Sequence, residues 1–323
     1  MSKSRKDDHI KLARMQDIKS NRFDDMILEG TDLPNLSMAD IDLSTTFLGN
    51  KIPYPIYINA MTGGSDEAYR INEFLAKIAN HFNIPMVTGS QSIIFKDPKA
   101  VNSFEVIRKH HDGILVGNVN PNMTLKQAKE AVTCIQADAL SIHLNVIQEL
   151  VMTEGDRDFR HWSHNIAQIN QSLNVPVIVK QVGLGLSNKT IKELKKIGIK
   201  YIDVAGSGGT SFIEIESKRS GKNYRYLNDF SIDTLDVLLN LQSETSIVYY
   251  ASGGIRNPLD VIKSLVLGAK ACGLSKWFLD LTYLSMQEAL TEVESFIEDL
   301  KKIMIILGAK SLKDLNHINY KLK

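Results

Sequence analysis

The sequence has few cysteines, almost no net charge and no long apolar run. Its two cysteines, Cys134 and Cys272, lie far apart without a CxxC pair, so neither a disulfide framework nor a cysteine zinc site is expected, and a cytoplasmic location is predicted. Lysine and arginine number 38 and aspartate and glutamate 37, a balance without the basic bias of nucleic-acid-binding proteins. The apolar run Ile303–Leu307 is far shorter than the ~20 residues of a membrane-spanning helix. We therefore expect neither nucleic-acid nor membrane partners.

Eight short runs rich in β-branched residues recur along the chain, and each is followed by a helical pattern. The runs are 56–59, 85–88, 114–117, 139–143, 176–180, 201–205, 247–251 and 271–274. Their starts are about 31 residues apart on average, which is the size of a βα unit. Most runs are almost continuously apolar, as expected for parallel strands that are covered on both faces. Eight units favour a closed (β/α)₈ TIM barrel, because a doubly wound open sheet usually has fewer strands.

The simplest division is one domain, 1–323, with appendages to the barrel. Residues 1–54 form an N-terminal helical and extended extension, 55–280 the barrel core and 281–323 a C-terminal helical segment. Within the extension, 8–19 is predicted as a helix and 40–54 as an extended or hairpin segment that plugs the barrel floor. Capping patterns predict helices that begin after Thr124, Thr190 and Asn257. The histidines at 110, 111, 161 and 164 are predicted to lie on solvated helical faces.

Polar and glycine-rich stretches follow every predicted strand. They are 59–64, 88–92, 117–120, 143–149, 180–185, 205–210, 252–256 and 274–276. The carboxyl ends of the strands form the catalytic face of a TIM barrel, so we expect these stretches to converge there. Two insertions, 143–158 and 211–229, also follow strands and lie where lids are found. The sequence therefore predicts an active site on this face.

Three stretches that follow the sixth, seventh and eighth strands are suited to holding phosphate. Gly253–Gly254 and Leu274–Ser275 lie after the seventh and eighth strands, where TIM barrels commonly bind phosphate through backbone amides, and Arg256 can add charge. Gly206–Thr210 forms a further backbone nest with a hydroxyl. A sugar-phosphate isomerase would show the same features, so the glycines alone do not decide the activity.

Two groups of side chains indicate chemistry. Lys180 ends the fifth strand, where a lysine can form a Schiff base, bind phosphate or stabilise an anionic ring. Strand alternation places His143 and Asn145 on one side, next to Gln148 and Glu149. Glu149 can hold Mg²⁺ when a substrate phosphate completes its coordination shell.

Together these motifs resemble those of the type 2, flavin-dependent isopentenyl-diphosphate isomerases. The matching stretches are Arg5-Lys6-x-x-His9, Met61–Gly64, Ser90-Gln91, Asn118, His143-x-Asn145-x-x-Gln148-Glu149, 180–185, 203–210 and 252–256. The RKxxH and HLNxxQE motifs are specific, whereas many FMN barrels share the glycine motifs. The chain departs from the family at Phe212, at 230–234 and at 275–277, which affects the detail of the flavin contacts.

The resemblance implies an isomerase that interconverts isopentenyl and dimethylallyl diphosphate over reduced FMN, with Mg²⁺ and with NADPH or NADH as reductant. It also implies a homo-oligomer, a tetramer or an octamer. Gln148 is implied as the catalytic residue, in a positioning or relay role, and Glu149 as the metal ligand. The implied substrate contacts are Arg5, Lys6, His9, Ser90, Gln91, Ser92, His143, Asn145 and Gln148. The implied FMN contacts are Ala60, Met61, Thr62, Gly63, Ser90, Asn118, Lys180, Ala205, Gly206, Thr210, Gly253, Gly254, Ile255, Arg256, Leu274 and Ser275.

Two other functions stay open at this point. A 2-hydroxyacid oxidase or a dihydroorotate dehydrogenase would share the FMN barrel, but such an oxidase needs a basic histidine facing the flavin, and 252–256 contains none. A non-catalytic flavin- or phosphate-binding protein would need neither Gln148 nor Glu149. The N-terminal charged run, 5–9, is either a solvated end or a segment that orders over the barrel mouth when substrate binds.

Overall fold

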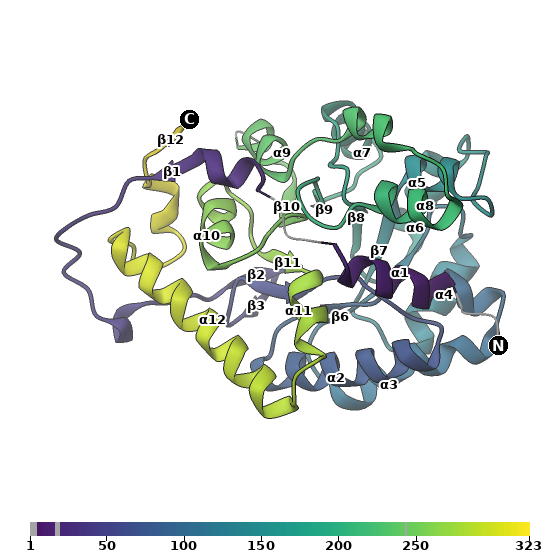
Figure 1. The fold of residues 1–323 in the computed structure, drawn as a ribbon, viewed down its shortest axis with the longest axis horizontal. Coiled ribbons are helices and arrows are strands. Elements are labelled where there is room, and N and C mark those ends of the chain that lie inside the picture. Colours follow the sequence, from purple (N-terminus) through teal and green to yellow (C-terminus); the bar gives the residue numbers. More distant parts are fainter. Residues whose placement is uncertain (1–4, 17–19, 243) are drawn as a thin grey trace.

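The computed structural model describes residues 5–16, 20–242 and 244–323, and its centre is a closed parallel barrel of eight strands (Figure 1). The order around the barrel is β10-β11-β4-β5-β6-β7-β8-β9, and pairing of β9 with β10 closes it. The strands are β4 (Ile56–Ile58), β5 (Met86–Val87), β6 (Leu115–Val119), β7 (Ala139–Leu144), β8 (Val177–Gln181), β9 (Tyr201–Asp203), β10 (Val248–Ser252) and β11 (Cys272–Leu274). Every predicted run overlaps one of them, and four strands end one or two residues beyond the predicted run, so the TIM-barrel prediction is confirmed.

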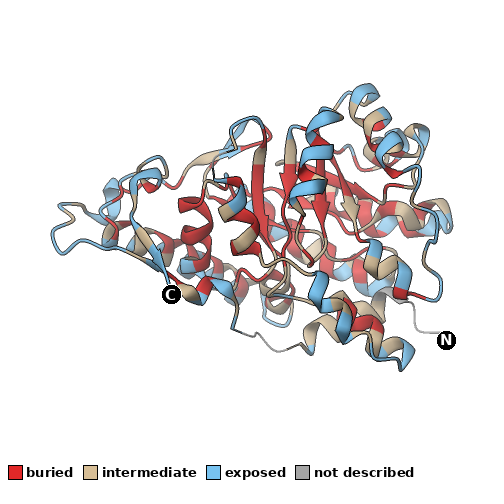
Figure 2. Ribbon diagram, turned by 90° about the horizontal axis from the view of Figure 1, so that it is seen from above, coloured by how far each residue is buried: buried red, intermediate tan, exposed pale blue. Residues whose placement is uncertain are grey.

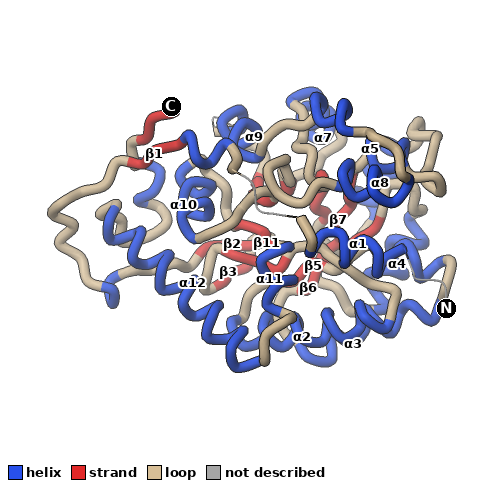
Figure 3. Tube along the Cα trace, in the orientation of Figure 1, coloured by secondary structure: helices blue, strands red, loops and turns tan. Residues whose placement is uncertain are grey.

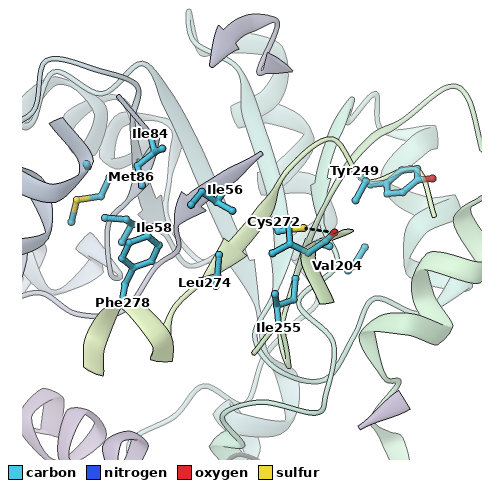
Figure 4. Close-up of a cluster of buried hydrophobic side chains, with 14 of the residues drawn as sticks. Ile56, Ile58, Ile84, Met86, Val204, Tyr249, Ile255, Cys272, Leu274 and Phe278 are labelled. Atoms are coloured by element: carbon cyan, nitrogen blue, oxygen red, sulfur yellow. Dashed lines mark hydrogen bonds between the residues drawn. The ribbon is translucent and has the colours of Figure 1, made fainter. Parts of the chain in front are cut away.

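Helices surround the barrel and alternate with its strands (Figure 3). They are α2 (Asp66–Phe82), α3 (Asn102–His110), α4 (Leu125–Cys134), α5 (Val146–Val151), α6 (Trp162–Ser172), α7 (Asn188–Lys196), α8 (Phe212–Ser220), α9 (Thr234–Leu241), α10 (Pro258–Val266) and α11 (Lys276–Leu281). Figure 2 shows buried strands inside and helices whose outer faces are exposed. Outward-facing side chains of β4, β5 and β11 pack with Phe278 of α11 in one buried cluster (Figure 4).

Two of the three predicted helix starts are confirmed. Thr124 caps α4 in a reciprocal capping box, and Asn257 caps α10 ahead of a proline. The third start is wrong, because Ser187 caps α7 by accepting a hydrogen bond from the backbone of Thr190 at 3.2 Å. The prediction that His111 is solvated is also wrong. Helix α3 ends one residue earlier, and the chain then turns inward and leaves this side chain 1% exposed.

A hairpin from the N-terminal extension closes the barrel floor, as predicted. Its strands are β2 (Thr45–Phe47) and β3 (Asn50–Ile52). The ring centroid of Phe47 lies 4.6 Å from that of Tyr250 and 5.1 Å from that of Tyr57, inside the barrel. The backbone N–H of Leu48 donates to the Tyr250 hydroxyl at 2.8 Å. The floor is therefore closed by aromatic packing.

The two ends of the chain differ from the predictions. Helix α1 (Arg5–Arg14) begins and ends earlier than the predicted 8–19, and 17–19 lie outside the described residues. The C-terminal segment contains α12 (Met286–Ile306) but ends in a strand, β12 (Tyr320–Leu322), which pairs antiparallel with β1 (Met26–Leu28). Short 3-10 helices complete the fold: η1 (Arg22–Asp25), η2 (Met38–Asp40), η3 (Gln91–Phe95), η4 (Pro98–Val101), η5 (Arg225–Phe230) and η6 (Asp314–His317). Within the described ranges, no helix combines the length and apolarity needed to cross a membrane.

Candidate active site

The polar cluster predicted after the fourth barrel strand is assembled at the end of β7. Asn145 caps α5, and its Oδ1 accepts from the backbone of Gln148 at 2.9 Å. Its Nδ2 donates to Gln148 Oε1 at 3.0 Å, which fixes the orientation of that amide. His143 Nδ1 lies 3.1 Å from Asn118 Oδ1 on β6. The structure therefore joins the side chains of Asn145 and Gln148 and places His143 against Asn118, while a shared role of the four residues in one site stays a prediction.

Glu149 lies in the first turn of α5, where a tight loop braces it. Its Oε2 accepts from the backbone of Asp156 at 2.9 Å. Arg157 donates to the Glu149 carbonyl at 2.5 Å and to the Met152 carbonyl at 2.7 Å. A Cβ at Gly155 would lie 2.0 Å from the same Glu149 carbonyl, so this close approach requires glycine. Sequence reasoning missed Gly155 and Arg157.

The glycines after β9 and β10 form a narrow cradle in which the backbone atoms of neighbouring loops lie in close contact. Gly253 has φ +85, and a Cβ there would lie 2.1 Å from the Gly206 carbonyl. A Cβ at Gly206 would lie 2.3 Å from the backbone nitrogen of Thr234. Asn21 of the extension donates to the Gly254 carbonyl at 2.7 Å. Asn21 and Thr234 were not predicted, because each comes from a segment with no glycine motif of its own.

Arg256 is held by carboxylates beside this cradle. It donates to Asp24 Oδ1 at 2.6 Å and to Asp260 Oδ2 at 2.8 Å. The hydrogen bond from Arg256 lowers the pKa of Asp24 to about 2, and the two carboxylates raise the pKa of Arg256. These contacts brace the loop after β10, and a contact between Arg256 and FMN stays a prediction.

The residues predicted after β5 serve the fold itself in this structure. Gln91 is fully buried, donates to the Ala131 carbonyl at 2.8 Å and accepts from the backbone of Asn118 at 3.0 Å. Ser90 donates to Ser92 at 3.1 Å. The substrate contacts predicted for these three residues stay predictions.

Several buried polar atoms around the barrel mouth lack a protein partner. Within the described ranges, the hydroxyls of Thr62, Thr88 and Ser141 accept and donate no hydrogen bond. Lys180 is 6% exposed, and its ammonium group donates no hydrogen bond to any of the same residues. Burial lowers the pKa of Lys180, and the Asp203 carboxylate opposes this effect. Since buried polar groups normally have partners, these atoms and the glycine cradle fit a polar cofactor with a phosphate. Thr88 lies in the predicted polar stretch 88–92 but was not named as an FMN contact, and Ser141 was not predicted.

Helix α1 contacts α2, α8 and α11 at the carboxyl end of the barrel (Figure 1). His9 Nε2 lies 2.8 Å from Glu216 Oε1 of α8, and its ring meets Phe212 edge-on at 5.9 Å. Ser65, which caps α2, donates to Asp7 at 2.7 Å. Arg5 and Lys6 open this helix, and their side chains lie outside the described part of the chain.

Comparisons with known proteins identify the family. A family model described as FMN-dependent dehydrogenase matches residues 108–321. An isopentenyl-diphosphate delta-isomerase from Streptococcus gordonii is 44% identical over 322 residues, which are 99% of this chain and 96% of the relative. The chain belongs to the isopentenyl-diphosphate delta-isomerase family. A second member, from Listeria innocua, is 41% identical and covers 96% of this chain and 89% of its own length.

Solved structures of other flavoproteins share the fold with this family member. A flavocytochrome b2 variant covers 98% of this chain and 83% of its own, with a TM-score of 0.68 and 17% identity. A mandelate oxidase variant with an FMN adduct covers 98% and 92%, with a TM-score of 0.66 and 13% identity. At these identities the likeness concerns the fold alone.

Proposed function

We propose that this chain interconverts isopentenyl diphosphate and dimethylallyl diphosphate at the carboxyl end of its barrel, with FMN, Mg²⁺ and NADPH or NADH as reductant. The observation that carries the proposal is the cluster of His143, Asn145, Gln148 and Glu149. Hydrogen bonds at 2.9 and 3.0 Å preset its amides. A barrel that only bound flavin would need neither this cluster nor the loop that braces Glu149.

The cofactor fits the polar atoms that lack a protein partner. In this proposal the hydroxyls of Thr62 and Thr88 and the ammonium group of Lys180 would contact its ring, and the amides around Gly253 and Gly254 would contact its phosphate. When bound and reduced, FMN supplies an electron-rich ring that stabilises positive charge on the alkene. The remaining FMN contacts predicted above belong to the same proposal.

The diphosphate is held between α5 and α1. No group of three metal-ligating side chains occurs in the described part of the chain, so Glu149 would hold Mg²⁺ together with oxygens of the substrate. His143 and Asn145 lie beside Glu149, and His9 reaches the same face from α1. Arg5 and Lys6, in the first turn of α1, would add the charge that a diphosphate requires.

Gln148 orients the alkene in this proposal. Its Oε1 is held by Asn145, which leaves Nε2 as the end of the amide directed toward a ligand. A neutral amide is a poor base, so Gln148 positions or relays a proton and does not abstract one. Helix α1 covers this region and excludes water from a cation-like transition state.

The experiment is an assay of the purified protein under anaerobic, NADPH-reduced conditions, with NMR detection of dimethylallyl diphosphate. We expect turnover only with FMN, Mg²⁺ and reductant together, and release of FMN on denaturation. Gln148→Ala should lose turnover and retain FMN, whereas the exposed Lys218→Gln should change neither. A protein that neither contains nor takes up FMN, or that forms no product, would refute the proposal. Light scattering on the same sample tests the proposed homo-oligomer, and cell fractionation tests the cytoplasmic location.

A further inference from the structure

A carboxylate inside the barrel is surrounded by four donors. Asp203 of β9 is 3% exposed. Its Oδ2 accepts from the Tyr57 hydroxyl at 2.9 Å and from Asn59 Nδ2 at 3.0 Å. Its Oδ1 accepts from the Ser252 hydroxyl at 2.6 Å and from the backbone N–H of Ala205 at 3.2 Å. These donors come from β4, β9 and β10 and the residues that follow them.

This set of partners suits the ionised form of Asp203. An ionised carboxylate has about four lone-pair sites and only accepts hydrogen bonds, whereas a protonated carboxyl must also donate one. All four partners are neutral groups, so they solvate the charge without cancelling it. Among the described residues, the carboxylate therefore has no charged hydrogen-bond partner inside the barrel.

The nearest cation in the pairing register is Lys180. Lys180 on β8 pairs directly with Asp203 on β9, and paired strands lie ~4.8 Å apart. On its other side Lys180 pairs with His143 of β7, and beyond Asp203 the titratable groups are the hydroxyls of Tyr57 and Tyr250 and the thiol of Cys272. Burial lowers the pKa of Lys180, and the Asp203 charge raises it. Asp203 is thus the group that opposes loss of the Lys180 proton.

We propose that Asp203 is a positioning residue that keeps Lys180 protonated beside the flavin. The inference rests on the FMN site of the proposed function. Asp203 cannot neutralise Lys180 through an ion pair, because neutral donors occupy its oxygens. Lys180 therefore keeps its charge and its hydrogen-bond donors for the electron-rich edge of the reduced ring. Asp203 acts through Lys180 and need not touch cofactor or substrate.

The first experiment measures the ionisation of Lys180 in the protein as purified. Lysine labelled with ¹³C at Cε is titrated by NMR, and the Lys180 signal is assigned by its absence from Lys180→Met. The midpoint of the titration is the pH at which Lys180 is half deprotonated. In Asp203→Asn this midpoint should fall, so that the proton concentration there is at least tenfold higher than in the wild type. Tyr57→Phe removes one donor and keeps both charges, so it should shift this midpoint less than twofold. An unchanged midpoint in folded Asp203→Asn overturns the inference.

The second experiment measures the two-electron reduction potential of bound FMN at a pH, taken from the first experiment, at which Lys180 is protonated in the wild type and deprotonated in Asp203→Asn. Asp203→Asn should weaken the binding of reduced relative to oxidised FMN at least tenfold, which lowers the potential by about 30 mV. Lys180→Met should show the same loss, and the double variant should lose no more than either single variant. Removal of a negative charge acting directly on FMN would raise the potential instead. A rise, or additive losses in the double variant, therefore overturns the inference.

The outcomes separate this inference from the proposed function. Absence of FMN or of isomerase activity in the wild type refutes the proposed function, while the NMR titration still decides whether Asp203 holds the Lys180 proton. Wild-type activity together with an unchanged Lys180 midpoint refutes only the inference. If Asp203→Asn does not fold, Asp203→Glu takes its place, because it retains the negative charge. The Lys180 midpoint in Asp203→Glu should stay within threefold of the wild type in proton concentration, and a larger shift contradicts the inference.

Discussion

Replacing Glu216 by glutamine should loosen α1 from the barrel mouth and leave the barrel intact. Glu216 of α8 is 2% exposed and contacts His9 of α1 at 2.8 Å and Arg219 at 2.6 Å. Burial alone would raise the pKa of Glu216, but His9 and Arg219 lower it. Glutamine keeps the shape of the side chain and removes its charge.

The magnitude follows from the contacts that α1 makes. A hydrogen bond to a charged group contributes about 1.5–3 kcal/mol. The contact between His9 and Glu216 joins α1 to α8, while Ser65 and Thr282 hold α1 elsewhere. Loss of the Glu216 charge should therefore make α1 open about 10- to 150-fold more often, since about 1.4 kcal/mol is tenfold. Because the folded-state pKa is lowered, the Glu216 contribution is present at neutral pH and is lost as the pH falls through that pKa.

Hydrogen exchange tests this prediction directly. Amides of 5–16 should exchange about 10- to 150-fold faster in Glu216→Gln, whereas those of the barrel strands should keep their wild-type rates. Lys218→Gln on the same helix is the matched control, because that side chain is exposed. The KM for isopentenyl diphosphate should rise and the FMN content should not change. Wild-type exchange across 5–16 in Glu216→Gln would show that this contact does not hold the helix.

Three further predictions concern the metal, the cradle and the N-terminal charges. Glu149→Gln should reduce turnover and require more Mg²⁺ at equal FMN content, and a Mg²⁺ titration that matches the wild type would place the metal elsewhere. Gly253→Ala puts a Cβ 2.1 Å from the Gly206 carbonyl at a φ of +85, so it should lower the free energy of unfolding by about 1–3 kcal/mol and reduce FMN occupancy. Thermal unfolding and flavin absorbance measure the two effects, and full FMN occupancy would contradict the role of the cradle in binding FMN. Replacing Arg5 and Lys6 together by alanine should raise the KM for isopentenyl diphosphate strongly, since each charge-assisted contact is worth about 1.5–3 kcal/mol. Steady-state kinetics measure this change, and a wild-type KM would show that the two residues form only a charged tail.

Features encoded by local sequence were predictable. Each barrel strand is a short apolar run flanked by turn residues, and parallel connection is the ordinary outcome of repeated βα units. The contact between Asn145 and Gln148 was predictable for the same reason, because these residues are about one helical turn apart and their side chains meet at 3.0 Å. Strand alternation and helix periodicity are enough to place such neighbours.

Features that depend on distant segments were not predictable. The pairing of β1 with β12 joins 26–28 to 320–322, and neither strand carries a strong alternating pattern. Three of the four hydrogen bonds of Asp203 come from Tyr57, Asn59 and Ser252, which reach it only once the barrel closes. Arg256 was predicted to add charge for a phosphate, but Asp24, which comes from the extension, binds it at 2.6 Å.

The N-terminal extension takes part in the site at three places. Phe47 closes the barrel floor against Tyr57, whose hydroxyl donates to Asp203 at 2.9 Å. Asn21 donates to the Gly254 carbonyl at 2.7 Å and so fixes the glycine cradle from outside the barrel. Helix α1 then covers the opposite end of the barrel through His9. Since one continuous segment contacts the barrel floor, the glycine cradle and the carboxyl end of the barrel, the barrel strands alone do not define the candidate active site.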